Sequence, residues 1–273
     1  EHAELHEFEL RLIRDLNTLA HRLDPTRKTI IVSHDSDRAA DVGIMAIPDL
    51  NGYNLYRGWY RPDPATLPVR LNELHAKNPT KPLILSEFGA GADPWIHSET
   101  PRRFDYSEEH MVNTLDATYD LFDKELNWLV GHNLWVFADF GAAHRVDTHP
   151  YINNKGLLDT DRQPKDAFFQ LKARLQKTDP VLYLQSPSWT TRGGAAEKVY
   201  RAFSNMGTVE FFHNGVSLGA QTKGFRWNVV LRAGANALLV KGVNADGTAR
   251  EHGFTVNYDP TRAPQIAPII PKR

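Results

Sequence analysis

The 273-residue sequence contains no cysteine, which excludes disulfide bonds, thiolate catalysis and cysteine-ligated zinc. It has no excess of charge of either sign, because 32 basic residues stand against 33 acidic ones and the formal net charge is −1. No global field therefore recruits nucleic acid or anionic lipid. No stretch approaches the ~18 apolar residues of a membrane span, and no basic-then-apolar leader precedes the first predicted helix. These absences predict a soluble protein whose function depends on a local site.

What is present fits an ordinary globular chain, with 41% apolar and 24% charged residues. The length allows about two domains. The lack of cysteine does not distinguish a cytoplasmic from a periplasmic location, because proteins of both compartments can lack cysteine; we expect a protein of the bacterial type. The sequence begins at Glu1 without an initiator methionine, so we expect a processed or trimmed chain, or a piece of a longer one.

The first part of the sequence alternates between helix and strand patterns. Between residues 4 and 23 apolar side chains recur at three- and four-residue steps, the period of an amphipathic helix. Because short aliphatic runs alternate with helices, the pattern predicts right-handed parallel crossovers, and thus an α/β barrel or a doubly wound sheet. The predicted elements are helices at 4–23, 67–78, from 107 onward and at 164–176, and strands at 29–33, 49–56, 83–85 and 133–137.

After residues 178–180 the pattern changes to short alternating strands separated by turn sequences such as Asn214-Gly215. This pattern predicts an antiparallel sandwich of about 80 residues. Residues 260–273 contain four prolines and no periodicity, and we expect a tail that lies on a surface or is disordered. The predicted strands are 181–185, 198–204, 209–213, 227–231, 237–243 and 253–258.

Glu87 is the first residue to suspect of chemistry. It follows the apolar run 83–85 and precedes Gly89 and Gly91, so a carboxylate ends a buried parallel strand. In α/β barrels the loops at that end of the strands build the active site. The alternative is a strand-end glutamate that only hydrogen-bonds a neighbouring loop.

Five motifs in order and spacing resemble glycoside hydrolase family 2, the family of β-galactosidases, β-glucuronidases and β-mannosidases. The resemblance covers residues 1 to about 176 and implies that the four strands are strands five to eight of a (β/α)8 TIM barrel. It also implies that an all-β, immunoglobulin-like sandwich follows. The domains would then be a catalytic barrel portion at 1–178, a β-sandwich at 179–259 and a proline-rich tail at 260–273. The motifs are Leu-Asp-Pro-Thr-Arg at 23–27, Gly-Tyr-Asn-Leu-Tyr-Arg-Gly-Trp-Tyr at 52–60, Leu-Ser-Glu-Phe-Gly-Ala at 85–90, Trp-Val-Phe-Ala-Asp-Phe-Gly-Ala-Ala-His-Arg at 135–145 and Asn-Lys-Gly-Leu-Leu-Asp-Thr-Asp-Arg-Gln-Pro-Lys-Asp-Ala-Phe-Phe at 154–169.

The resemblance implies a retaining exo-β-glycosidase with Glu87 as the nucleophile. Tyr56 matches the family tyrosine that lies against the nucleophile, and Asn54 matches a sugar-contacting residue of the same strand. Trp135 matches the tryptophan that forms the floor of the sugar site, where an indole face suits the C–H face of a pyranose. The alternatives are core aromatic residues at the ends of strands and a turn asparagine.

A retaining mechanism also needs a second carboxyl group, ~5–5.5 Å from the first. The resemblance places this acid/base at Glu1, with Glu4 as the fallback inside the helix pattern. The alternative is a trimmed terminus whose first residue happens to be glutamate.

Substrate choice depends on Asn153 and Lys155, which fit the Asn-x-Lys pattern that grips the carboxylate of a uronic acid in β-glucuronidases. Segments 97–98 and 107–109 also favour a glucuronidase. Because many bacterial β-galactosidases carry similar runs, we rank a β-galactosidase slightly ahead, with a β-glucuronidase as the alternative. Lys155 could equally be a surface lysine.

No cofactor is implied, and the expected partner is a carbohydrate substrate rather than nucleic acid or a membrane. Half of a parallel barrel leaves open strand edges, so we expect a homo-oligomer, association with the missing half, or a more open sheet. The alternative from another functional class is a non-catalytic carbohydrate-binding remnant. Asp139 and Arg145 are expected to hold the barrel rim together. The spacing of His132, His144, His149, Asp139 and Asp147 fits no standard metal site.

Overall fold

The computed structural model describes residues 2–122 and 126–270. Its chain divides into two compact units. The first unit comprises residues 1–90 and 114–135, and the second comprises residues 91–113 and 136–273.

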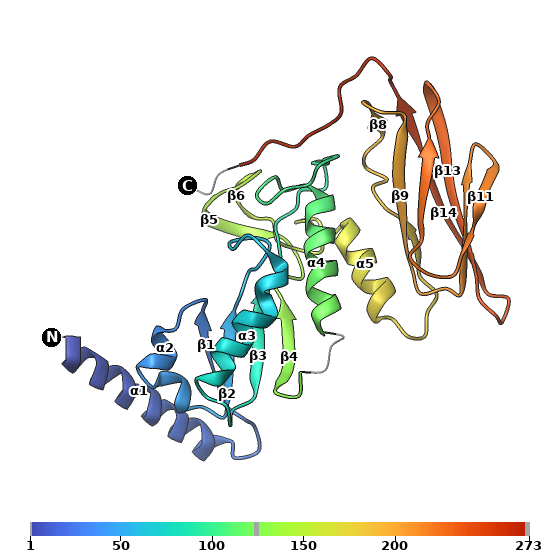
Figure 1. Ribbon diagram of the computed structural model, residues 1–273. Coiled ribbons are helices and arrows are strands. Elements are labelled where there is room, and N and C mark those ends of the chain that lie inside the picture. The colour runs from blue at the N-terminus through green and yellow to red at the C-terminus, as the bar shows by residue number, and fades with distance from the viewer. Residues whose placement is uncertain (1, 123–125, 271–273) are drawn as a thin grey trace. The chain divides into compact units, whose positions relative to one another are not determined.

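A parallel sheet of four strands, in the order β1-β2-β3-β4, forms the centre of the first unit (Figure 1). The predicted order of four parallel strands, each reached through a helical connection, is confirmed. Short aliphatic runs form the inner strands, and in β3 Leu83 and Leu85 are buried, whereas the edge strands β1 and β4 contain no fully buried residue. The strands are β1 (Ile30–His34), β2 (Leu50–Asn54), β3 (Leu83–Phe88) and β4 (Leu129–Leu134).

The fourth strand begins earlier than predicted. The apolar run at 133–137 suggested the strand, whereas β4 is Leu129–Leu134. Hydrogen bonding to β3 decides the boundary, because the ladder begins where the N–H of Leu83 donates to the carbonyl of Trp128, at 2.7 Å. Pairing with a neighbouring strand is a tertiary property that a hydrophobic run does not reveal.

Helices and 3₁₀ turns connect these strands. The turn before α3 begins at Asp63, whose side chain accepts a hydrogen bond from the N–H of Ala65, with Pro64 in the first position. In α4, Glu108 and Glu109 occupy the first turn, where carboxylates complement the helix dipole. The elements are α1 (His2–Leu23), α2 (Arg38–Asp41), η1 (Ile44–Ala46), η2 (Pro64–Thr66), α3 (Leu67–Ala76) and α4 (Glu108–Phe122), whose residues 114–122 belong to the first unit.

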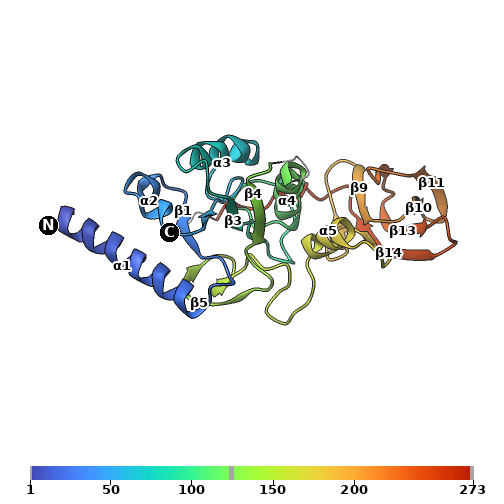
Figure 2. The same cartoon turned by 90° about the horizontal axis from the view of Figure 1, so that it is seen from below.

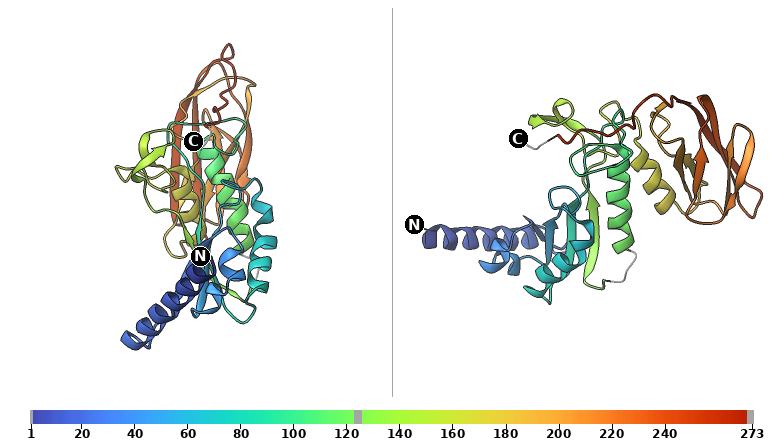
Figure 3. Two further views of the ribbon diagram at one scale, coloured as in Figure 1. Left: turned by 90° about the vertical axis from the view of Figure 1, so that its left-hand side faces the viewer. Right: turned by 45° about the horizontal axis from the view of Figure 1, so that its top comes forward.

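The apolar stripe of α1 is exposed. Figure 3 shows this helix along its length at the N-terminal end of the first unit, and the hydroxyl of Thr29, just before β1, donates to Asn17 Oδ1 of α1 at 2.6 Å. Leu12 and Leu16 are 45% and 55% exposed, and Val32 on β1 is 50% exposed. Both the helix face and the edge strand therefore expose apolar surface that another polypeptide segment could cover.

The second unit contains a hairpin, a helix and two β-sheets. The larger sheet has the order β11-β10-β13-β14-β8 and the smaller one β12-β9-β7. All of their pairings are antiparallel except β14 with β8. The elements are β5 (Phe140–Val146), β6 (Pro150–Asn153), α5 (Asp166–Leu175), β7 (Leu182–Leu184), β8 (Thr191–Arg192), β9 (Glu197–Ser204), β10 (Thr208–His213), β11 (Val216–Gln221), β12 (Arg226–Val230), β13 (Gly234–Val243) and β14 (Ala249–Tyr258).

One buried cluster contains side chains from both sheets, several strands of which are labelled in Figure 2. Tyr200 and Trp227 enter it from the smaller sheet, and Phe211, Val240 and Val256 enter it from the larger one. The helix α5 attaches to the smaller sheet through Phe169, whose ring stacks on Tyr183 at a centroid distance of 3.9 Å. The six predicted strands are present, but β5, β6, β8 and β11 were not predicted. The strand β11 does alternate apolar residues with polar residues or glycine, but as an edge strand it is exposed along nearly its whole length.

Residues 260–270 lie on the surface of the second unit, which is the first of the two states expected for the tail. The N–H of Glu99 donates to the carbonyl of Gln265, and the N–H of Ile270 donates to the carbonyl of Phe104, each at 2.8 Å. Ala267 is buried. Among the residues that the structure describes, no helix combines the length and apolar character needed to cross a membrane.

Candidate active site

Glu87 lies at the carboxyl end of β3, where parallel strands present their functional side chains. Gly89, two residues on, has a φ of +144° that L side chains rarely adopt. A Cβ at this position would lie 2.7 Å from the carbonyl oxygen of Trp135. The glycine therefore lets the end of β3 pass close against the chain that leaves β4.

The Tyr56 hydroxyl donates a hydrogen bond to Glu87 Oε2 at 2.6 Å. Tyr56 follows β2, and the N–H of Leu55 donates to the Glu87 carbonyl at 2.8 Å, which fixes the two strand ends relative to each other. Tyr56 is buried, as a core aromatic residue would be, but its polar end reaches the carboxylate. A short hydrogen bond of this kind orients one carboxylate oxygen.

Asn54 is the last residue of β2 and lies opposite Glu87 in the register of the sheet. Its Oδ1 accepts a hydrogen bond from the Ser86 hydroxyl at 2.8 Å. The register shifts between Tyr53 and Asn54, and such irregularities turn side chains at the ends of strands. Ser86 was not among the predicted site residues, although it lies next to Glu87 in the motif.

Trp135 follows β4 at the same edge of the sheet. Its N–H donates to the carbonyl of Phe88 at 2.9 Å, so the backbone after β4 is bonded to the last residue of β3. The side chain is half-buried. The four residues expected from the motifs, Asn54, Tyr56, Glu87 and Trp135, are thus brought to one edge of the sheet, and their roles stay predictions.

Glu1, the residue predicted as acid/base, lies outside the described residues. The fallback, Glu4, lies within α1.

Asn153 and Lys155 belong to the second unit, at and after the end of β6. The Lys155 ammonium donates to Asn153 Oδ1 at 3.2 Å. Lys155 is only 1% exposed, so the alternative of an ordinary surface lysine is wrong. Lysines are almost never fully buried unless they are paired, so the position of Lys155 is set by the fold around it.

Asp139 and Lys165 form a buried ion pair with N–O distances of 2.8 and 2.9 Å. The same ammonium donates to the carbonyl oxygen of Ala92 at 2.7 Å, and Gly156 donates its N–H to Asp139 Oδ1 at 2.7 Å. Burial raises the pKa of Asp139, against the opposing effect of the lysine charge. Asp139 thus ties several segments together, as expected of a rim residue, while its partner Lys165 was missed because nothing in the spacing connects positions 139 and 165.

Arg145 contacts a carboxylate within its own loop. Its guanidinium lies 3.8 Å from Asp147 Oδ2.

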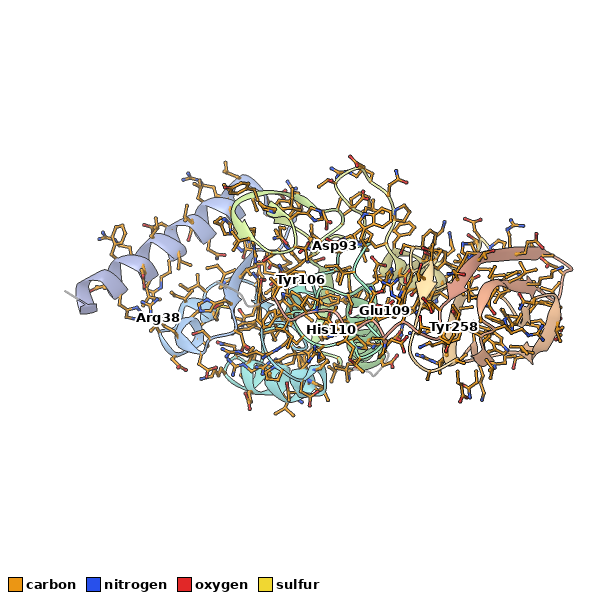
Figure 4. All side chains as sticks on the ribbon, turned by 90° about the horizontal axis from the view of Figure 1, so that it is seen from above. Arg38, Asp93, Tyr106, Glu109, His110 and Tyr258 are labelled. Atoms are coloured by element: carbon orange, nitrogen blue, oxygen red, sulfur yellow. The ribbon has the colours of Figure 1, made fainter. Side chains whose placement is uncertain are left out.

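A second polar cluster surrounds Glu109, which is labelled in Figure 4. His97 Nδ1 lies 2.8 Å from Glu109 Oε1, and the N–H of Ser98 donates to Oε2 at 3.1 Å. Segments 97–98 and 107–109, noted in the sequence for another reason, are therefore joined by hydrogen bonds. Burial opposes ionisation of Glu109, but the hydrogen bond and charge of His97 outweigh it and lower the pKa.

Glu108 and Asp166 are fully buried neighbours of this cluster. Glu108 Oε2 accepts the N–H of Asp166 at 2.5 Å, and the Tyr183 hydroxyl donates to Asp166 Oδ1 at 2.9 Å. Burial raises the pKa of Glu108 well above its usual range, and the negative charge of Asp166 raises it further. Burial is also the main cause that raises the pKa of Asp166 to about 6, and the negative charge of Glu109 is the second cause. The sequence showed these carboxylates but not that the fold would bury them together.

The histidines considered for a metal site have other neighbours. His132 stacks on Phe122 at a centroid distance of 4.0 Å, and His149 Nδ1 lies 3.1 Å from Asp93 Oδ2. Within residues 2–122 and 126–270, no group of three or more histidine or acidic side chains is arranged to hold a metal ion.

Residues 9–179 match the family model described as "Glycosyl hydrolases family 2, TIM barrel domain". The chain is 32% identical over 257 residues to a β-glucuronidase of Bacteroides fragilis, covering 88% of this chain and 34% of that protein. It is 32% identical over 184 residues to the human β-glucuronidase, covering 64% of this chain and 27% of that protein.

Among solved structures, the Bacteroides uniformis β-glucuronidase superimposes with a TM-score of 0.86 at 32% identity. The match covers 94% of this chain and 32% of that one. The chain thus spans about a third of the length of the relatives it matches.

Proposed function

This chain belongs to glycoside hydrolase family 2, and from that premise we propose that it carries the nucleophile of a retaining β-glycosidase. The observation that carries the proposal is the 2.6 Å hydrogen bond from the Tyr56 hydroxyl to Glu87 at the carboxyl edge of a parallel sheet. Glu87 attacks the anomeric carbon, and Tyr56 orients the attacking carboxylate. Asn54 hydrogen-bonds the sugar, and Trp135 lies against its C–H face.

The mechanism requires a second carboxyl group, and Glu1 is the residue proposed for it. It protonates the leaving oxygen in the first step and activates water in the second. Its carboxyl group would have to lie ~5–5.5 Å from that of Glu87, as retention of configuration requires.

We propose a β-glucuronidase, the alternative reading of the sequence, in place of the β-galactosidase that the sequence ranked first. Two findings support this choice. The relatives compared above are β-glucuronidases. Lys155 is a buried cation bonded to Asn153, and such an ammonium attracts the carboxylate of a uronate in a way that a neutral galactoside cannot exploit.

The test compares nitrophenyl β-glucuronide with nitrophenyl β-galactoside on the natural protein. We expect the glucuronide to be the better substrate and Glu87→Gln to abolish turnover of both. Lys155→Met should reduce turnover of the glucuronide by about 100-fold or more, because a charge-assisted contact is lost. Turnover of the galactoside should change little, and Lys172→Met, which removes an exposed lysine of α5, serves as the control.

The outcomes separate the hypotheses. A preference for the galactoside that survives Lys155→Met would return the assignment to a β-galactosidase. Absence of turnover with both substrates, with sugar binding retained, would indicate the non-catalytic carbohydrate-binding remnant.

We further propose that the four parallel strands are strands five to eight of a (β/α)8 barrel, with domains at 1–178, 179–259 and 260–273. The two sheets after residue 179 would be an immunoglobulin-like sandwich. Limited proteolysis should then cleave first within 176–180, between α5 and β7. Early cleavage within the strands of the sheets would contradict these boundaries.

Exposed apolar side chains on α1 and β1 support the proposal that further chain completes the barrel, either a second copy or a preceding segment. Light scattering on the purified chain distinguishes a monomer from an oligomer. A monodisperse monomer that does not associate with any barrel segment would contradict this proposal.

A further inference from the structure

A pocket of about 240 Å³ in the second unit contains none of the residues proposed for catalysis. It is formed by the loop after Gly91, the end of the β5–β6 hairpin and the segment before α5. Its wall combines an indole, an imidazole, an amide and several carboxylates. These side chains include Asp93, Trp95, His149, Asn154 and Asp161.

Trp95 presents its indole to solvent at the edge of this pocket and is 76% exposed. A fixed turn holds it, because Asp93 Oδ1 accepts the N–H of Trp95 and the Asp93 carbonyl accepts the N–H of Ile96, each at 3.0 Å. Asp93, labelled in Figure 4, is itself anchored by donating its N–H to the carbonyl of Tyr106 at 2.8 Å. An exposed indole whose backbone is fixed by a hydrogen-bonded turn is preorganised to stack against a ligand.

Asn154 supplies a polar group that the described residues leave unsatisfied. The side chain is 2% exposed and lines the pocket, and its amide nitrogen donates to the Thr148 hydroxyl at 2.6 Å. Its Oδ1 is buried, and in the part of the chain that the structure describes it has no hydrogen-bond partner. A buried acceptor without a donor is unfavourable, and a ligand hydroxyl would satisfy it.

The charges of the wall select the kind of ligand. Asp161 is an exposed carboxylate, and Asp93 Oδ2 lies 3.1 Å from His149 Nδ1. Asp139, also in the wall, is occupied by Lys165. Acceptors predominate over donors, so an anion would be repelled, whereas a molecule with several hydroxyl donors would find partners.

We propose that this pocket is a binding site for one neutral pyranose ring. The C–H face of the sugar stacks on Trp95, one hydroxyl donates to Asn154 Oδ1, and others donate to the carboxylates of Asp93 and Asp161. The volume is smaller than the ~300–1,000 Å³ of pockets that hold drug-sized ligands and suits a single ring. The site would bind a neutral sugar of a larger glycan independently of any hydrolysis.

Saturation-transfer NMR tests the proposal with methyl β-D-glucopyranoside as the neutral probe and D-glucuronate as the acidic one. The intact chain and its Glu87→Gln variant should both bind the neutral glucoside through this pocket. Trp95→Ala should weaken that binding at least about tenfold, because truncation of an aromatic anchor has an effect of this size. Trp95→Phe should retain part of it, and Asn154→Ala should weaken it.

Tyr151→Ala is the matched control, since Tyr151 is an aromatic residue 63% exposed in the same unit that does not line the pocket. It should bind the glucoside as the parent does. Circular dichroism confirms that each variant is folded. Binding of the glucoside that is unchanged in both Trp95→Ala and Asn154→Ala would overturn the proposal.

Two further outcomes would also overturn it. One is tighter binding of glucuronate than of the glucoside at a site that depends on Trp95. The other is binding of Ca²⁺ alone, detected by calorimetry and removed by Asp161→Asn, without any binding of the sugar. Loss of enzymatic activity has no bearing on this test, because binding is measured directly and is assigned to the pocket by its dependence on Trp95 and Asn154.

Discussion

Replacement of Lys165 by methionine should destabilise the second unit strongly. The side chain is fully buried, and its ammonium bonds Asp139 as well as the carbonyl oxygens of Ala92 and Asn154, at 2.7 and 3.4 Å. Methionine fills a similar volume but leaves the Asp139 carboxylate buried without its cation. The substitution therefore isolates the loss of charge pairing from the loss of packing.

The expected magnitude follows from the burial of both partners. Breaking a buried ion pair by removing one member costs about 3–5 kcal/mol, because the remaining charge is uncompensated. For a chain of this size the melting temperature should fall by about 6–20 °C. Adding Asp139→Asn should recover part of the loss, since the amide is neutral and its oxygen still accepts the Gly156 N–H.

Calorimetric melting of the parent, the two single variants and the double variant measures this coupling. Lys177→Met, which removes an exposed lysine beyond α5, is the control and should change stability by less than about 0.5 kcal/mol. A loss of under about 1 kcal/mol in Lys165→Met, or no recovery in the double variant, would refute the reasoning.

Three further substitutions test other contacts. Tyr56→Phe should lower kcat about 10- to 100-fold with little change in melting temperature, because the hydrogen bond to Glu87 is lost while the aromatic ring is kept. An unchanged kcat would remove Tyr56 from the mechanism. Gly89→Ala should destabilise the first unit by about 1–3 kcal/mol, measured by urea unfolding, because the residue has a φ of +144° and its Cβ would meet the Trp135 carbonyl. Burial raises the pKa of Glu108, so the contribution of this group to stability is fully present below its unfolded-state pKa and is lost as the pH rises through its folded-state pKa. The variant Glu108→Gln lacks this loss, and its stability relative to the parent should therefore increase from pH 5 to 8. A difference in stability that does not change with pH would contradict the assignment.

The order of the elements and the location of the nucleophile candidate could be predicted from local sequence patterns. Parallel strands are recognisable because both faces are buried, so an apolar run such as 83–85 is visible without knowledge of its neighbours. The position of Glu87 at the end of that run follows from the same pattern. The helix at 4–23 was equally plain, since its periodicity is a local property, although its apolar face proved to be exposed in this chain.

Which distant side chains meet could not be predicted in this way, because it depends on the packing of the folded chain. Lys155 is indistinguishable in sequence from a surface lysine, and its burial beside Asn153 depends on how the β5–β6 hairpin closes. The pairing of Lys165 with Asp139 joins residues 26 positions apart. Among the described residues Asn154 Oδ1 has no hydrogen-bond partner, and this depends on how the surrounding loops fold. Such contacts arise from chain packing rather than from local propensity, because hydrogen bonds and charges act over a few ångströms in space and carry no signature in sequence spacing.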